Sequence, residues 1–214
     1  MRDVKICGLM RAEDVAAAIA AGASYLGFIV EAASKRRLTV MQAARIARPA
    51  KGIIPYVAVT VNASDALLAR VMDHMQPDYI QCHGDESPDR VAEIARKFKV
   101  KTIKAAAISS QEDMQLAESY AGAADFILYD AKPPRGSKVR GGHGLSFDWS
   151  LLNKAPLPKI WALAGGLTLD NIDTAIASCR APILDVSSGV EVRAGHKDHH
   201  KIQLFIAKAH GRGS

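Results

Sequence analysis

The chain has 214 residues, of which 49% are hydrophobic and 23% charged, and this composition excludes an intrinsically disordered protein. Its formal net charge is +6, but the basic residues are scattered except at Lys35-Arg36-Arg37, and only 6% of the residues are aromatic. We therefore expect an anionic small molecule as the partner, with neither nucleic acid nor a membrane bound.

The three cysteines, Cys7, Cys82 and Cys179, are widely spaced and form no CxxC pair. This spacing predicts neither a disulfide framework nor a zinc ribbon. Reduced thiols, a polar N-terminus without a signal-peptide core, and the lack of a bilayer-length apolar run predict a cytoplasmic protein. Nothing in the sequence indicates an oligomeric state.

The first half of the chain predicts strands and helices in alternation. The expected strand and helix pairs are residues 4–8 and 14–21, 25–30 and 40–48, 53–61 and 65–75, and 78–82 and 88–97. Gly22 closes the first of these helices and Thr39 caps the second. Pro88 opens the fourth, since proline is tolerated in a first helical turn.

The second half continues the alternation. The expected pairs are residues 100–106 and 111–120, the strand 125–130 followed by a long loop over 131–144, then 158–163 and 170–178, and 183–186 and 198–209. Eight strands alternating with helices predict an α/β protein with a single (β/α)8 barrel domain over residues 1–214. The alternative is an open doubly wound sheet, which lacks its usual GxGxxG after the first strand.

Two strand ends carry candidate acid–base groups. Cys7 ends the first strand and shares a face with Lys5, which is a candidate pocket residue. Asp130 ends the strand 125–130 on the face of Phe126 and Leu128. Active sites of such barrels lie at the C-terminal strand ends, so these two groups could supply the base and the acid of a proton-shuttling isomerisation. The alternatives are a core cysteine and a surface aspartate.

Two loops near the end of the chain are rich in glycine and serine. Gly165-Gly166 and Ser187-Ser188-Gly189 follow the last two strands, where barrels of this kind commonly bind phosphate through converging N–H groups. The alternative is a pair of ordinary turns. Arg36 follows the second strand, and its planar fork suits a carboxylate unless it is only a solvated cation.

Histidines offer weaker signals. His83 follows the strand 78–82 and is a candidate for the pocket, whereas Cys82 is more simply a strand residue. His196, His199 and His200 suggest a metal, but no Asp, Glu or Cys group accompanies them at the spacing of a site. We predict no metal.

Taken in order, the motifs resemble the phosphoribosylanthranilate isomerase family from Lys5 to about Phe205. The matching pieces are Lys5-Ile6-Cys7-Gly8, Gly27-Phe28, Ser34-Lys35-Arg36, Val61-Asn62, Gln81-Cys82-His83-Gly84-Asp85-Glu86, Gly141-Gly142-His143-Gly144, Phe147-Asp148-Trp149, Ala164-Gly165-Gly166-Leu167, Asp185-Val186-Ser187-Ser188-Gly189-Val190-Glu191, Gly195 and Lys197-Asp198.

The resemblance implies a (β/α)8 isomerase of tryptophan biosynthesis that rearranges N-(5-phosphoribosyl)anthranilate. It implies that Asp130 is the general acid that opens the ribose ring and that Cys7 is the base that takes the C2 proton. It further implies that Arg36 holds the anthranilate carboxylate, that the Gly166 and Ser187-Ser188-Gly189 loops hold the phosphate, and that no metal or organic cofactor takes part.

The sequence departs from the family where Lys35, His143 and Cys82 stand, which usually hold proline, threonine and an aliphatic residue. Two alternatives are open. One is another phosphosugar isomerase of the same fold, bifunctional with histidine biosynthesis, although Cys7 stands where that family has an aspartate. The other is a non-catalytic phosphate-ligand binder, which the presence of both Cys7 and Asp130 disfavours.

Overall fold

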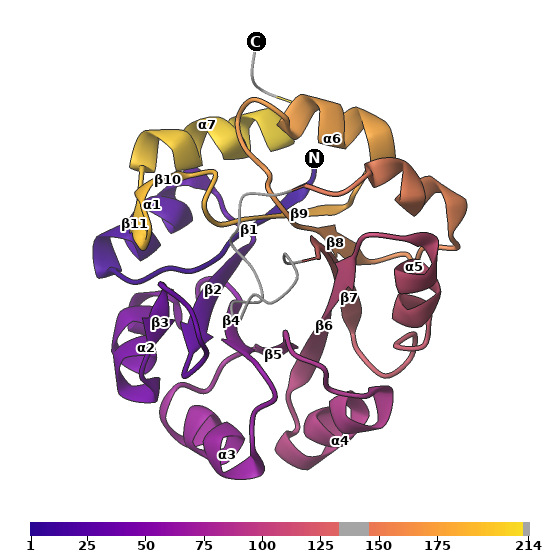
Figure 1. The fold of residues 1–214 in the computed structure, drawn as a ribbon. Coiled ribbons are helices and arrows are strands. Elements are labelled where there is room, and N and C mark those ends of the chain that lie inside the picture. Colours follow the sequence, from indigo (N-terminus) through magenta and orange to yellow (C-terminus); the bar gives the residue numbers. More distant parts are fainter. Residues whose placement is uncertain (133–145, 212–214) are drawn as a thin grey trace.

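The computed structural model describes residues 1–132 and 146–211, so nearly all of the predicted loop 131–144 lies outside the described residues. Eight parallel strands form the barrel in Figure 1: β1 (Asp3–Ile6), β2 (Tyr25–Val30), β4 (Tyr56–Thr60), β5 (Tyr79–Cys82), β6 (Lys101–Ile108), β7 (Phe126–Ala131), β8 (Trp161–Leu163) and β9 (Ile183–Val186). Strand β1 pairs with both β2 and β9, which closes the sheet. The predicted closed barrel is confirmed, and the open sheet is wrong.

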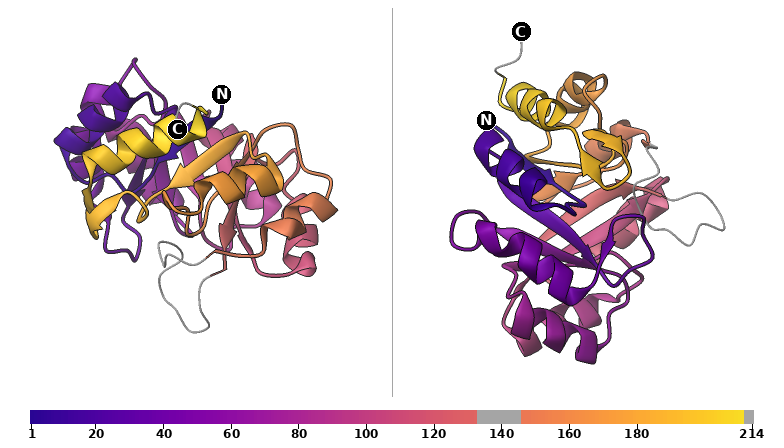
Figure 2. Two further views of the ribbon diagram at one scale, coloured as in Figure 1. Left: turned by 90° about the horizontal axis from the view of Figure 1, so that it is seen from above. Right: turned by 90° about the vertical axis from the view of Figure 1, so that its left-hand side faces the viewer.

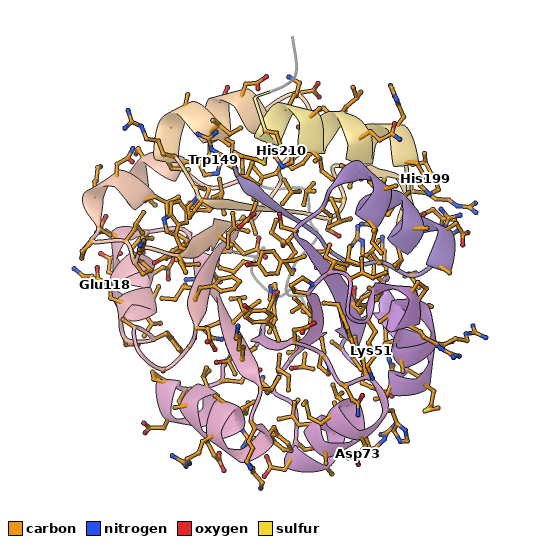
Figure 3. The ribbon with its side chains drawn as sticks, turned by 180° about the vertical axis from the view of Figure 1, so that it is seen from behind. Lys51, Asp73, Glu118, Trp149, His199 and His210 are labelled. Atoms are coloured by element: carbon orange, nitrogen blue, oxygen red, sulfur yellow. The ribbon has the colours of Figure 1, made fainter. Side chains whose placement is uncertain are left out.

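Helices surround the barrel, as the two side views show (Figure 2): α1 (Ala12–Ala21), α2 (Val40–Ala47), α3 (Asp65–His74), α4 (Pro88–Phe98), α5 (Gln111–Glu118), α6 (Ile172–Cys179) and α7 (His199–Ala209). Seen from behind, Asp73 and Glu118 lie at the outer rim (Figure 3). The predicted caps are confirmed, since Gly22 ends α1 and the Thr39 side chain accepts from the Gln42 amide at the start of α2. No helix within the described residues is long and apolar enough to cross a membrane.

Five short elements were not predicted. Strand β3 (Arg37–Leu38) lies beside β2, and a hairpin of β10 (Glu191–Arg193) and β11 (His196–Lys197) follows β9. Two 3-10 helices, Arg48–Ala50 and Trp149–Lys154, follow α2 and β7. Elements of two to six residues are too short to show a hydrophobic period. The predicted strand 53–61 begins only at Tyr56, because Ile53 lies in a turn and is 69% exposed.

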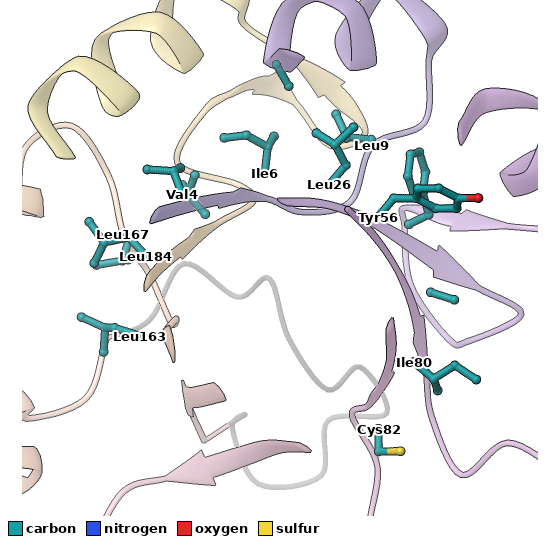
Figure 4. Packing of buried hydrophobic residues seen from close by; sticks show 14 of the residues in the cluster. Val4, Ile6, Leu9, Leu26, Tyr56, Ile80, Cys82, Leu163, Leu167 and Leu184 are labelled. Atoms are coloured by element: carbon teal, nitrogen blue, oxygen red, sulfur yellow. The ribbon is translucent and has the colours of Figure 1, made fainter. Parts of the chain in front are cut away.

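Alternation along the strands builds two apolar layers. On β1, Val4 and Ile6 face the helices, in the outer cluster drawn in Figure 4. Cys7, directly after β1, belongs instead to a smaller cluster inside the barrel, together with Leu128 of β7. Cys82 lies in the outer cluster, as expected of a strand residue. The fold therefore separates the thiol of Cys7, which faces inward, from that of Cys82, which faces the helix layer.

Candidate active site

A cavity of about 730 Å³, open to solvent, lies at the C-terminal ends of the barrel strands. Its lining includes eight of the ten residues that the sequence predicted for the site: Cys7, Arg36, His83, Asp130, Gly165, Gly166, Ser187 and Ser188. Lys5 and Gly189 do not line it. The structure thus brings together, from six segments of the chain, the groups proposed for proton transfer, carboxylate binding and phosphate binding.

Cys7 lies at the mouth of β1, where its backbone N–H donates to the Val186 carbonyl at 2.9 Å. Lys5, two residues earlier on β1, is fully buried, and its Nζ donates to Asp185 Oδ1 at 2.8 Å. A Cβ added to Gly27 would lie 2.9 Å from Cys7 Sγ and 3.1 Å from Lys5 Nζ. The thiol and the ammonium therefore pack side by side against Gly27 of the neighbouring strand.

This packing sets the ionisation of both groups. Burial raises the pKa of the Cys7 thiol, and the nearby Lys5 charge opposes that rise without cancelling it. For Lys5, burial acts to lower the pKa, but the Asp185 carboxylate and Cys7 outweigh it and raise the pKa above its ordinary value. Without a ligand, Cys7 is thus a thiol beside a permanently charged lysine.

Asp130 ends β7 with its carboxylate on the cavity wall. Its Oδ1 accepts from the Ala131 N–H at 2.8 Å, and its Oδ2 lies 3.2 Å from His83 Nε2. The Gln81 side-chain amide in turn donates to His83 Nδ1 at 2.8 Å, which places the imidazole proton on Nε2, facing Asp130. The sequence placed His83 in the pocket, and the structure adds that it contacts the proposed acid directly.

Gly165 permits the close approach of the loop after β8 to the end of β7. It has φ +85°, and an added Cβ would lie 2.5 Å from the Ala131 amide nitrogen and 3.1 Å from Asp130 Oδ1. Only glycine takes this backbone conformation at little cost. The Gly165-Gly166 turn therefore packs next to the proposed acid and also lines the cavity.

Arg36 is 6% exposed, so the interpretation as a solvated cation is wrong. Its Nε and Nη2 each donate to the Glu191 carboxylate at 2.7 Å. Lys197 Nζ also donates to Glu191, at 2.9 Å. The sequence analysis gave Glu191 and Lys197 no role. Both belong to the motifs of the resemblance, which was the signal that could have found them, but neither spacing nor residue type predicted a contact across 155 residues.

The loops after β8 and β9 form a further part of the cavity wall. Gly166 is held through its carbonyl, which accepts from Asn171 Nδ2 at 2.8 Å, and Ser187 through its carbonyl, which accepts from Lys197 Nζ at 2.9 Å. Gly189 lies behind this wall, where its backbone bridges to Thr168. An added Cβ there would lie 2.0 Å from the Leu167 carbonyl oxygen, so Gly189 joins the two loops.

The histidines that suggested a metal lie apart from the cavity. His196 contacts Arg193 on the β10–β11 hairpin, and His199 Nε2 lies 2.8 Å from Asp14 Oδ1. Within residues 1–132 and 146–211, no group of three or more His, Cys, Asp or Glu side chains is arranged to hold a metal ion.

Comparison with known proteins gives one consistent family. A family model described as N-(5'phosphoribosyl)anthranilate (PRA) isomerase matches residues 4–208. The N-(5'-phosphoribosyl)anthranilate isomerase of Rhodopseudomonas palustris (strain BisA53) is 45% identical over 97% of this chain and 95% of its own. That of Paracoccus denitrificans (strain Pd 1222) is 44% identical over 96% of each.

Solved structures agree with the sequence relatives. The phosphoribosyl anthranilate isomerase of Thermotoga maritima superposes with a TM-score of 0.85 at 35% identity, over 99% of this chain and 100% of that one. A phosphoribosyl anthranilate isomerase in complex with reduced 1-(o-carboxyphenylamino)-1-deoxyribulose 5-phosphate superposes with a TM-score of 0.83 at 32% identity, again over 99% and 100%.

Proposed function

The chain belongs to the N-(5'-phosphoribosyl)anthranilate isomerase family, and from that premise we propose that Cys7 and Asp130 divide the two proton transfers of its reaction. The enzyme is an isomerase of tryptophan biosynthesis. It converts N-(5-phosphoribosyl)anthranilate into 1-(2-carboxyphenylamino)-1-deoxyribulose 5-phosphate by an Amadori rearrangement. We further propose that it works in the cytoplasm, which its three free thiols support.

Ring opening is the first step. Asp130 delivers a proton to the ribose ring oxygen, the bond from C1 to that oxygen breaks, and the anthranilate nitrogen supplies the electrons that form a Schiff base. Asp130 must carry a proton when the substrate binds, and its contact with His83 Nε2 at 3.2 Å supplies a neighbour through which that proton can be exchanged.

Proton abstraction is the second step. Cys7, as thiolate, takes the proton from C2 and gives an enolamine, which becomes the ketone when C1 gains a proton. Because burial raises the pKa of Cys7, the thiolate is a minor form before substrate binds. The ammonium of Lys5, beside the thiol at Gly27, is the charge that favours the thiolate once it forms.

The substrate carries an anionic group at each end, and the cavity offers a site for each. We assign the anthranilate carboxylate to Arg36, and the phosphate to the loops of Gly165, Gly166, Ser187 and Ser188, with Gly189 as their support. The single observation that carries the proposal is this convergence: Cys7 and Asp130 line the same cavity as Arg36 and the two glycine- and serine-rich loops.

Fluorescence of the anthranilate ribosyl phosphate, made in situ, tests the proposal, because its conversion removes the signal. We expect the wild-type enzyme to be active, and we expect Cys7→Ala and Asp130→Asn each to lower kcat by at least about a hundredfold, the scale of a positioned acid or base. Both variants should still bind the reduced product analogue. If Cys7→Ala keeps near wild-type kcat, Cys7 is a core residue and His83 becomes the candidate base.

A further inference from the structure

The β10–β11 hairpin brings a buried carboxylate behind the proposed carboxylate site. Glu191 is 8% exposed, and its two oxygens accept from Arg36 Nε and Nη2, from Lys197 Nζ, and from the Gly195 N–H at 3.3 Å. We propose that Glu191 is a positioning residue that holds Arg36 directly and Ser187 through Lys197, so that one buried cluster sets both anion-binding ends of the site.

The contact with Arg36 leaves a single direction for the substrate. A bidentate pair fixes the guanidinium in the plane of the Glu191 carboxylate. Nη1 is then the nitrogen of Arg36 without a partner among the described residues, and Arg36 lines the cavity. Glu191 therefore aims the free edge of the fork, which a flexible arginine side chain would not keep in one place.

The contact with Lys197 extends the same cluster to the other end of the cavity. Lys197 is 3% exposed, and its Nζ donates to the Ser187 carbonyl at 2.9 Å as well as to Glu191. Gly8 brings the two ends together, since an added Cβ would lie 2.5 Å from Arg36 Cδ and 3.0 Å from Ser187 Oγ. A shift of Glu191 would therefore move Arg36 and the Ser187 loop together.

The charges of the cluster suit an anionic ligand. Arg36 and protonated Lys197 are the cationic partners of the Glu191 anion, which leaves one net positive charge behind the cavity. Burial lowers the pKa of Lys197, and the Glu191 carboxylate opposes that fall. Burial acts to raise the pKa of Glu191, but Arg36 and Lys197 outweigh it and hold that pKa below its usual range. Glu191 is therefore ionised at neutral pH, and its removal would leave two buried cations without a counter-charge.

The test uses Glu191→Gln in the full chain, with the reduced product analogue and inorganic phosphate as probes in calorimetry. A hydrogen bond to a charged group changes a binding constant by about a factor of ten or more. We therefore expect the Kd of the analogue to rise at least about tenfold. The Kd of inorganic phosphate should also rise, although Glu191 does not line the cavity. KM should rise while kcat stays within about threefold. Arg193→Gln, which removes an exposed charge from the same hairpin, should change neither Kd.

A double-mutant cycle shows whether Glu191 acts through Arg36. In an Arg36→Ala background, Glu191→Gln should raise the Kd of the analogue by no more than it raises the Kd of phosphate. Unchanged affinity for both probes in Glu191→Gln overturns the proposal, as does full additivity with Arg36→Ala.

If Glu191→Gln fails to fold, Lys197→Met takes its place. It leaves the Arg36–Glu191 pair intact and should weaken phosphate binding. Unchanged phosphate affinity in this variant overturns the link to Ser187.

The inference rests on the proposed role of Arg36, and the two fail differently. If Arg36→Ala binds the analogue as tightly as the wild type, the carboxylate assignment is wrong. The link from Glu191 to the Ser187 loop is then tested by phosphate affinity alone, because Lys197 contacts both Glu191 and Ser187 and this path does not involve Arg36. Unchanged phosphate affinity in Glu191→Gln overturns it, and weaker phosphate binding supports it.

Discussion

At the scale of single residues, Arg36 binds an internal carboxylate, that of Glu191, and we propose that it also binds an external one, that of the substrate. Glu191 occupies two nitrogens of Arg36, and we assign the third to the substrate. Arg36 is buried, and without Glu191 it would lack a counter-charge before the substrate binds. The internal partner stabilises the charge, and the remaining edge provides recognition.

Arg36→Ala tests that recognition. We expect KM to rise at least about tenfold with kcat little changed, because contacts to a group that does not react are similar in the ground and transition states. The variant leaves Glu191 paired with Lys197, so it buries no unpaired charge. Arg37→Ala, which removes an exposed arginine paired with Glu31, is the matched control and should leave KM unchanged. A fall in kcat with unchanged KM would place Arg36 in the chemical step.

The pH profile tests the state of Cys7. Burial raises the pKa of its thiol, and only the thiolate reacts with an alkylating agent, so the rate at which iodoacetamide alkylates Cys7 in the free enzyme should rise with pH through and beyond the ordinary cysteine value of about 8.5. Cys7→Ser should lose this alkylation along with most activity, because a hydroxyl is a much weaker acid than a thiol. An alkylation rate that already levels off below about pH 8 would show that the pKa of Cys7 is not raised.

At the scale of elements, the site depends on how loops from neighbouring strands meet. The sequence analysis located the strand ends well, since Tyr25–Val30 and Ile183–Val186 are strands within the predicted bounds. It therefore placed Cys7, Asp130 and the two glycine-rich loops on one rim. It could not predict the β10–β11 hairpin, because two- and three-residue strands have no period, nor the partners that this hairpin supplies to Arg36.

Gly189→Ala tests the junction between the loops after β8 and β9. Its Cβ would lie 2.0 Å from the Leu167 carbonyl oxygen, so the loops must separate, and overpacking of this kind costs about 1–3 kcal/mol or more of unfolding free energy. Phosphate binding should weaken as well. Gly52→Ala is the control: it adds only backbone strain at φ +75°, with no atom within 4 Å, and should leave phosphate binding intact. Urea unfolding and phosphate calorimetry measure both effects, and wild-type values for Gly189→Ala would show that the junction is not tight.

At the scale of the whole molecule, the barrel closes where β1 meets β9, and this seam contains a buried ion pair. Lys5 stands opposite Asp185 in the parallel register, and their side chains meet at 2.8 Å. The sequence analysis placed Lys5 on the face of Cys7 as a candidate pocket residue, but the hydrophobic pattern that predicted the barrel gave no sign of its partner Asp185. Closure turns its face into the interior, so the partner could be identified only from the folded chain.

Lys5→Met should lower the free energy of unfolding by about 3–5 kcal/mol, because it removes the ammonium that pairs with the Asp185 carboxylate inside the barrel. The double variant Lys5→Met with Asp185→Leu should recover part of that loss, since no charge is then left unpaired. Lys159→Met, at an exposed lysine, should be neutral. Urea unfolding of the four proteins measures the effect, and a neutral Lys5→Met would mean that the seam is held by packing and backbone hydrogen bonds alone.

We propose that Asp130 serves ring opening and Cys7 serves proton removal from C2, and substrate deuterated at C2 distinguishes the two steps. The isotope effect on kcat appears only to the extent that breaking the C2–H bond limits the rate. We predict a large effect in Cys7→Ser, in which the impaired base makes that step limiting. In Asp130→Asn we predict an effect close to one, because ring opening is then limiting. Equal isotope effects in the two variants, or the reverse order, would contradict the assignment of the two residues.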